Sequence, residues 1–188
     1  FSNFETFTFY FKIIVTGIIP AVFVGLFTPI QDIIDGSPYL LLVTGISYLF
    51  FAILLIFSER INKSENIGIN EITIKQAFII GLAQSIALLP GISRSGVTLL
   101  MAIYLGVKKA DAIYYSLLLG IPTIFGAWSL TFINQSFTVN ADIIIPTIVA
   151  MFTGVLAIKV LINFTTNSKL QFFGFYCLLL SGFCFLVS

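Results

Sequence analysis

The sequence predicts an all-α, polytopic membrane protein with about five transmembrane helices plus one re-entrant helix–loop–helix. Of the 188 residues, 59% are hydrophobic and 9% are charged, whereas soluble domains contain about 25% charged residues. Apolar stretches of about 18 residues or more, the length of a membrane-spanning helix, recur along the chain. The formal net charge is +1, and no run of Lys and Arg suggests a nucleic-acid partner. We therefore expect residues 1–188 to form a single integral membrane domain in the lipid bilayer.

The membrane-spanning segments follow from the apolar stretches between polar loops. The first predicted span opens at Lys12 and ends before a turn that contains Asp32 and Asp35. The most polar loop, residues 58–75, separates the second span from an apolar region that is split by polar residues. The predicted spans cover residues 12–28, 39–57, 112–133, 142–163 and 171–187, and the split region covers residues 76–106.

Cationic residues indicate on which side of the membrane each loop lies. Lys and Arg are counted in the short loops because cytoplasmic loops carry an excess of them. They occur in or beside the loops at 58–75, 106–111 and 164–170, and none occurs at 28–38 or 134–142. The first three loops are therefore predicted to be cytoplasmic, and the other two are predicted to be external.

The split region at 76–106 is the predicted re-entrant segment. Because the loops on both sides of it are predicted to be cytoplasmic, it must cross the membrane an even number of times or not at all. The apolar parts before Pro90 and after Gly96 have about 14 and about 10 residues, whereas a full crossing needs about 20. A helix that enters, turns and returns fits this length. Two tight spans, 76–92 and 95–112, joined by an external loop remain the alternative.

The stretch "LLPGISRSGVTLL", residues 88–100, interrupts this region with polar residues. Pro90 is expected to end the first half-helix because it lacks an N–H and clashes with the preceding turn. Gly91 and Gly96 permit a tight turn and close approach by a ligand. Ser93 or Ser95 could cap the second half-helix, whose N-terminus would then point into the site.

Arg94 makes this turn a candidate anion-binding site. Helix N-termini present unpaired N–H groups and a partial positive charge, and a guanidinium adds donors that fit phosphate oxygens. An arginine at a helix centre in the membrane costs about 2.5–3.5 kcal/mol on insertion scales, so it needs a partner. No Asp or Glu lies inside a predicted span, apart from Asp142 at the first position of the span 142–163. An external anion, or a carboxylate from a segment outside this chain, is the expected counter-charge.

A purely structural role for these polar residues remains open from the sequence alone. Arg94 could cap the C-terminal carbonyls of a helix, and the serines could bond neighbouring helices. Gln84, in the middle of the first half-helix, could likewise bond a neighbouring helix. Cys177 and Cys184 are seven residues apart on one predicted helix face, so we expect them to pack as small hydrophobes without a disulfide or a metal.

At residues 90–98, "PGISRSGVT" resembles the PGxSRSxxT motif of the undecaprenyl-diphosphatase family, the bacitracin-resistance membrane phosphatases. The resemblance covers essentially the whole chain. Four further segments resemble the family: "TGIIPAVFVGLF", "KQAFIIGLAQSIALLPGISRSGVT", "YYSLLLGIPTIFGA" and "VLAIKVLINF".

The resemblance implies an inverted-repeat fold, of which this chain holds the second re-entrant unit. It implies hydrolysis of undecaprenyl diphosphate to undecaprenyl phosphate and inorganic phosphate, which recycles the lipid carrier of peptidoglycan synthesis at the bacterial inner (plasma) membrane. The active site is expected to open toward the outer face. The catalytic residues implied are Arg94, Ser93 and Thr98, and the substrate-binding residues are Gly91, Ser95, Gly96 and Gln84.

The sequence departs from the family pattern in two places. The first motif of the family, a Glu-x-x-x-Glu followed by Pro-x-Ser-Ser-Thr-Gly-His, is absent from these residues. We therefore expect an N-terminally truncated member that is inactive alone. We expect no metal ligands in this chain and a divalent cation, Mg²⁺ or Ca²⁺, held by residues outside it. In the last span Tyr176 is followed by Cys177, where the family tends to have Arg.

Two other functions compete with the phosphatase. A polyprenyl-phosphate transporter or flippase could use the same re-entrant anion site without hydrolysis, since inverted repeats and midplane sites suit transporters equally well. A catalytically inactive membrane scaffold is the third reading. Release of phosphate would distinguish the phosphatase from the transporter. The presence of the Glu pair and His upstream would distinguish the phosphatase from the inactive scaffold. A homodimer is one option for the assembly.

Overall fold

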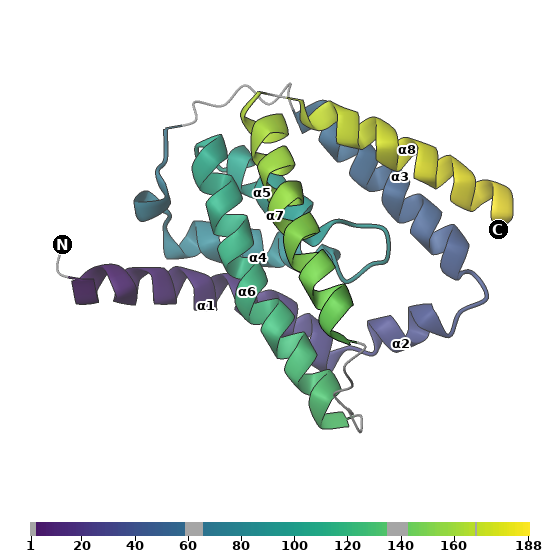
Figure 1. Ribbon diagram of the computed structural model, residues 1–188, viewed down its shortest axis with the longest axis horizontal. Helices are drawn as coiled ribbons and strands as arrows, with labels where there is room; N and C mark the ends of the chain where they lie inside the picture. The colour runs from purple at the N-terminus through teal and green to yellow at the C-terminus, as the bar shows by residue number, and fades with distance from the viewer. Residues whose placement is uncertain (1–2, 59–65, 135–142, 168) are drawn as a thin grey trace.

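The computed structural model describes residues 3–58, 66–134, 143–167 and 169–188, and Figure 1 shows its helices. Hydrophobic stretches form long helices because a helix satisfies every backbone N–H and C=O internally, which a bilayer requires. The helices are α1 (Asn3–Phe27), α2 (Ile30–Asp35), α3 (Leu40–Ser58), α4 (Ile74–Ile86), α5 (Arg94–Tyr104), α6 (Lys109–Asn134), α7 (Ile144–Thr166) and α8 (Leu170–Val187), with a short 3-10 helix, η1 (Ile69–Glu71).

Five of the described helices, α1, α3, α6, α7 and α8, are long and apolar enough to cross a membrane. Most of their side chains face outward. In α7, 0% of the most hydrophobic 18-residue window is buried. A surface of this kind suits lipid rather than water. The chain is therefore an all-α, polytopic membrane protein, as predicted.

The predicted spans agree with the helices to within three residues, except at the first one. We predicted that this span starts at Lys12, but α1 starts at Asn3. The prediction was wrong because Lys12 lies exposed on the helix surface, where a long side chain can carry its charge to the interface without ending the helix. Helix α2 occupies the segment that we predicted as a turn.

Helices α1, α4, α5 and α6 pack into one group. Glycines bring α1 and α4 into close contact, since a Cβ atom on Gly81 would collide with the carbonyl oxygen of Gly17. One turn before Gly17, the hydroxyl of Tyr115 from α6 donates to the carbonyl oxygen of Ile13 in α1 at 2.8 Å. Small residues and interhelical hydrogen bonds of this kind hold helices together in lipid.

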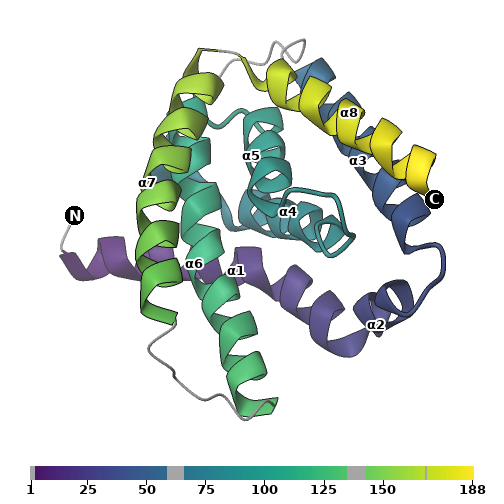
Figure 2. The same cartoon turned by 45° about the vertical axis from the view of Figure 1, so that its right-hand side comes forward.

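Helices α3 and α8 form a second group, in which they lie side by side (Figures 1 and 2). A Cβ atom on Gly174 would lie 3.0 Å from the carbonyl oxygen of Ala52. About two turns further along α8, the hydroxyl of Ser181 donates to the carbonyl oxygen of Gly45 at 2.8 Å. The residue numbers rise on one helix as they fall on the other, so the two helices are antiparallel.

The predicted re-entrant region consists of two short helices. Helices α4 and α5 have 13 and 11 residues, which correspond to about 20 Å and about 17 Å, whereas the hydrocarbon core is about 30 Å thick. The segments before α4 and after α5 meet, because Ile67 and Val107 form an isolated parallel bridge. These lengths favour a re-entrant hairpin over two tight spans, and its placement in the membrane stays a prediction.

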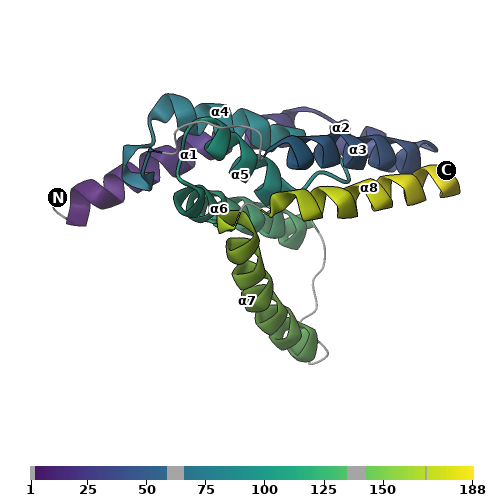
Figure 3. The same cartoon turned by 90° about the horizontal axis from the view of Figure 1, so that it is seen from above.

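Helix α7 diverges from the other helices, as Figure 3 shows from above. Its main helical neighbour is α6. The membrane sidedness that we predicted from charge is not tested by this arrangement. Arg60 and Lys63 of the predicted cytoplasmic loop lie outside the described residues, as do residues 135–142 of the predicted external loop.

Candidate functional site

The loop between α4 and α5 places the motif beside α3. Helix α4 ends at Ile86, because the ring of Pro90 would clash with the carbonyl at this position if the helix continued. Gly91 has φ +92°, and a Cβ atom there would lie 2.9 Å from the carbonyl oxygen of Thr44 in α3. Both the dihedral angle and the space therefore require glycine, as the sequence predicted.

Ser93 is the N-cap of α5. Its Oγ accepts a hydrogen bond from the backbone N–H of Gly96 at 3.2 Å, which decides between the two serines that we had proposed. The hydroxyl of Ser95 lies 3.5 Å from that of Ser93. Gly96 allows the first turn of α5 to approach α3, because a Cβ atom there would lie 2.5 Å from Cζ of Phe51.

Arg94 is the first residue of α5, and its guanidinium reaches α6. Its Nη2 donates to the carbonyl oxygen of Leu119 at 3.2 Å. Leu119 lies in the middle of α6, so Arg94 does not cap the end of that helix. A guanidinium carries five N–H donors, and among the described residues no carboxylate pairs with it. The arginine can therefore accept an anion as a further partner.

Thr98 fixes α5 against α6. It is 1% exposed, and its Oγ1 lies 2.7 Å from the hydroxyl of Ser116 and 3.0 Å from the carbonyl oxygen of Arg94. The hydroxyl of Ser116 in turn donates to the carbonyl oxygen of Ser95 at 2.9 Å. These contacts support a positioning role for Thr98, and its predicted catalytic role stays a prediction.

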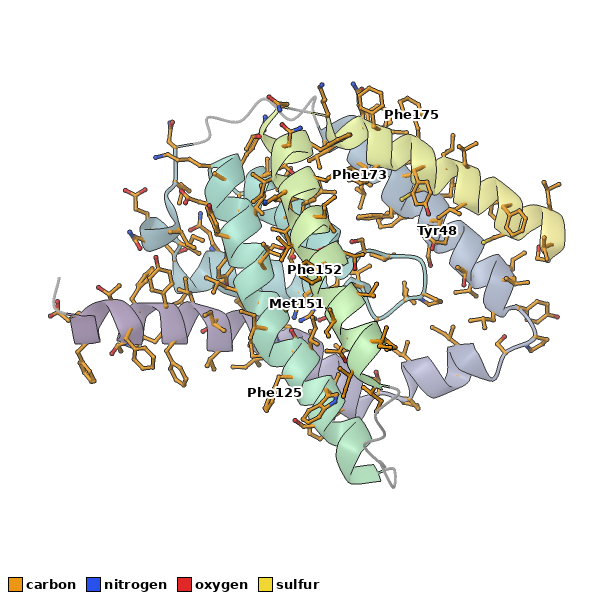
Figure 4. All side chains as sticks on the ribbon, viewed as in Figure 1. Tyr48, Phe125, Met151, Phe152, Phe173 and Phe175 are labelled. Atoms are coloured by element: carbon orange, nitrogen blue, oxygen red, sulfur yellow. The ribbon has the colours of Figure 1, made fainter. Side chains whose placement is uncertain are left out.

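A cavity of about 400 Å³, the α3–α8 cavity, lies between the motif and the α3–α8 pair. Ser93, Ser95 and Gly96 line it from the motif side. Figure 4 labels two of the residues on its opposite walls, Tyr48 of α3 and Phe173 of α8. Tyr176 and Cys177 of α8 also line the cavity. Cys177 stands at the position where the family tends to have Arg, so this position lies in the cavity wall.

A larger cavity of about 820 Å³, the α6–α7 cavity, lies on the other side of α5. Arg94, Ser95 and Ser116 form its polar part. The remaining wall is apolar and comes from α6 together with Ile158 of α7. Ser95 lines both cavities, so the N-terminal turn of α5 lies between them.

The structure does not bring Gln84 together with the rest of the predicted site. Its side chain is 2% exposed, and neither its amide oxygen nor its amide nitrogen has a partner among the described residues. It lines neither of the two cavities. The alternative that it bonds a neighbouring helix therefore gains no support, and substrate binding by Gln84 stays a prediction.

Sequence reasoning missed Tyr48, Tyr176 and Ser116. Ser116 carries a weak signal, because an antiparallel neighbour of α5 places it opposite Thr98, but serine is common in membrane helices. The two tyrosines carry no signal of their own, since only the pairing of α3 with α8 brings them to the motif. Cys177 is buried, as predicted, and its thiol is free.

The described residues contain no group of three or more His, Cys, Asp or Glu side chains that could hold a metal ion. The site described here therefore supplies cationic and hydroxyl groups but no carboxylate cluster. Such an arrangement can bind and position an anion. A divalent cation would need ligands from residues other than these.

Known proteins are similar to this sequence. The family model described as "Bacitracin resistance protein BacA" matches residues 2–183. An undecaprenyl-diphosphatase of Methanococcus maripaludis is 39% identical over 173 residues, covering 90% of this chain and 66% of the relative. An undecaprenyl-diphosphatase of Thermosipho africanus is 36% identical over 184 residues, which cover 97% of this chain and 71% of the relative. An undecaprenyl-diphosphatase 2 of Halalkalibacterium halodurans is 40% identical over 139 residues, which cover 70% of this chain and 49% of the relative. The chain thus spans just under two thirds of the length of the first of these relatives.

Proposed function

The chain belongs to the bacitracin resistance protein BacA family, and from this premise we propose that the protein hydrolyses undecaprenyl diphosphate to undecaprenyl phosphate and inorganic phosphate. The names of its relatives support this reaction. The product would be the lipid carrier of peptidoglycan synthesis. The transporter or flippase alternative is not favoured, because the names of these relatives describe a diphosphatase.

One observation carries the proposal: Arg94 stands at the N-terminus of α5, without a carboxylate partner among the described residues, and lines a cavity. Phosphoryl transfer depends mainly on positioning and on neutralising the charge of the phosphate oxygens. Arg94 and the first backbone N–H groups of α5 would bind these oxygens. The hydroxyls of Ser93 and Ser95 would orient them from the neighbouring cavity.

The nucleophile needs an activating base, which we propose comes from outside these 188 residues. A bare hydroxyl such as that of Ser93 is a weak nucleophile without one. The sequence contains no His, and the resemblance assigns the Glu pair and His to the motif that is absent here. We therefore propose that the 188-residue chain binds the lipid diphosphate but hydrolyses it only together with that motif.

A divalent cation, Mg²⁺ or Ca²⁺, belongs to the same proposal. It would neutralise phosphate charge when bound. Because the described residues offer no carboxylate cluster, the ligands of this cation would lie outside this chain. The chain is a multi-pass membrane protein, and we propose the bacterial cell membrane as its location. A homodimer stays a prediction that cross-linking in native membranes would test.

The experiment measures release of inorganic phosphate from undecaprenyl diphosphate by a form of the protein that includes the first family motif. Removing one preorganised donor of this kind costs about 10²–10³ in rate, so we expect a loss of that size for Arg94→Ala and a smaller loss for Arg94→Lys. Lys159→Ala, which removes a cation from α7, is the control and should keep full activity. Undiminished hydrolysis by Arg94→Ala would refute the role of Arg94. Lipid translocation without phosphate release would favour the transporter.

A further inference from the structure

We propose that the α6–α7 cavity binds the hydrocarbon chain of the lipid whose diphosphate binds at Arg94. The inference rests on the proposed function, because it assigns a place to the second half of that substrate. Neither the family motif nor the names of the relatives assign a role to this cavity. Three features of the cavity carry it: a polar end, an apolar wall and a direction.

The polar end matches an anionic head group. Arg94 lines the cavity from α5, together with the hydroxyl-bearing residues Ser95 of α5 and Ser116 of α6. The guanidinium bonds one carbonyl oxygen of α6 and has no carboxylate partner in the described part of the chain. An amphiphile with a negative head would therefore be oriented with that head toward α5.

The apolar wall matches a hydrocarbon chain. Its large side chains are those of Ile121, Ile124, Phe125 and Trp128 from α6 and of Ile158 from α7, and Leu117 and Gly120 of α6 also line it. The rings of Phe125 and Trp128 lie 6.0 Å apart between centroids. Large apolar side chains this close to an arginine form a surface with one charged end, and the volume of about 820 Å³ lies within the range of ligand pockets.

The direction of the cavity follows α6. From Gly120, next to the carbonyl that Arg94 bonds, to Trp128 the helix rises about 12 Å. Helix α7 diverges from α6 (Figure 3), and both the head-group end and the apolar end of the cavity are lined by α6. A chain bound there would run along α6 away from the motif.

The α3–α8 cavity is the less suitable place for this chain. Its walls combine the hydroxyls of Tyr48 and Tyr176 with those of Ser93 and Ser95. A polyprenyl chain offers no hydrogen bond to the hydroxyls of Tyr48 and Tyr176, and covering them without one costs free energy. The polar groups of the α6–α7 cavity lie at one end of it. A hydrocarbon chain along the apolar wall would therefore not cover these groups.

A glycine in this wall allows a test that should not disturb the fold. A Cβ atom on Gly120 would have nothing within 4 Å, and the same holds for Gly126 on the same helix. Gly120 lines the cavity and Gly126 does not. Gly120→Leu therefore places a side chain inside the cavity, and Gly126→Leu is the matched control with the same change in helix propensity.

Binding is measured with the 188-residue chain in nanodiscs, through the fluorescence of Trp128, the single tryptophan of the sequence. The probe is undecaprenyl phosphate with a quencher on its chain, displaced by unlabelled undecaprenyl diphosphate or by inorganic diphosphate, which has no hydrocarbon chain. We expect Gly120→Leu to weaken the binding of undecaprenyl diphosphate about tenfold, as if roughly two methylene groups were no longer buried. Binding of inorganic diphosphate should stay at the wild-type value, and Gly126→Leu should change the binding of neither ligand.

Several outcomes would overturn the proposal. Equal losses in both variants, or none in Gly120→Leu, would show that the chain does not use this cavity. If a phosphate-free polyprenol quenches Trp128 equally well, or if self-association shields Trp128, the cavity holds bulk lipid or a second copy of the chain. Hydrolysis is not measured, so failure of the proposed reaction would leave the binding pattern unchanged and would be recognised separately.

Discussion

Replacing Thr98 with valine removes a buried hydroxyl that connects α5 to α6 without changing the shape of the side chain. The hydroxyl lies 2.7 Å from Oγ of Ser116 and within 3.1 Å of the carbonyl oxygen of Ser95. Ser116→Ala removes the other partner. The two variants and their combination form a double-mutant cycle, in which the coupling isolates the interaction between the two helices.

The magnitude follows from the contacts. Each hydroxyl contributes about 0.5–1.5 kcal/mol through its hydrogen bonds, so each single variant should lose about 1 kcal/mol of unfolding free energy. Interhelical hydrogen bonds measured by such cycles in a membrane protein average about 0.6 kcal/mol and reach about 1.7 kcal/mol. Because the bond between Thr98 and Ser116 is buried, the double variant should lose less than the sum of the singles by about this amount.

The assay is equilibrium unfolding in mixed detergent micelles, followed by the circular dichroism of the helices. Thr153→Val combined with Ser116→Ala is the control pair. The hydroxyl of Thr153 bonds only carbonyls of its own helix, α7, in the described contacts, so this pair should be additive within about 0.3–0.5 kcal/mol. If the coupling free energy between Thr98 and Ser116 were no larger than that of the control pair, the contact would be refuted, and with it the positioning role of Thr98.

Three further substitutions test the packing and the loop. Gly81→Ala should cost about 1–3 kcal/mol of stability in the same unfolding assay, since its Cβ atom meets the backbone of Gly17 rather than a movable side chain; an unchanged midpoint would contradict the close packing of α1 and α4. Tyr115→Phe should cost up to about 1.7 kcal/mol, because it removes the bond to the carbonyl of Ile13; a stabilised variant would argue against that bond. Gly91→Ala combines left-handed strain of about 1–2 kcal/mol with a contact against α3, and it should weaken diphosphate binding; wild-type binding would show that the turn does not position α5.

The sequence predicted the helices well because hydrophobic length determines them. It also predicted a tight turn at Gly91 and a cap at Ser93 or Ser95, since both features depend on nearest neighbours in the chain; the structure selects Ser93 as the cap. The start of α1 was missed because Lys12 was read as a boundary, although a lysine inside a long helix can direct its charge to the interface.

The pairing of the helices could not be predicted from the sequence. In lipid every face of a helix is apolar, so the amphipathic pattern that orients helices in soluble proteins is weak. The residues that hold α3 against α8, such as Gly45, Gly174 and Ser181, are of types that occur throughout membrane helices. The two tyrosines of the α3–α8 cavity could be found only after this pairing was known.

The pairing of α3 with α8 has a consequence for biosynthesis. A chain made from its N-terminus inserts α3 long before residues 170–187 leave the ribosome, and domains generally fold in that order. Until α8 is inserted, α3 lacks the helix whose Gly174 packs against Ala52 and whose Ser181 hydroxyl donates to the carbonyl oxygen of Gly45. The α8 wall of the α3–α8 cavity is therefore completed after the others, so a ribosome that stops before Leu170 would release a chain in which the motif turn has α3 beside it but lacks α8.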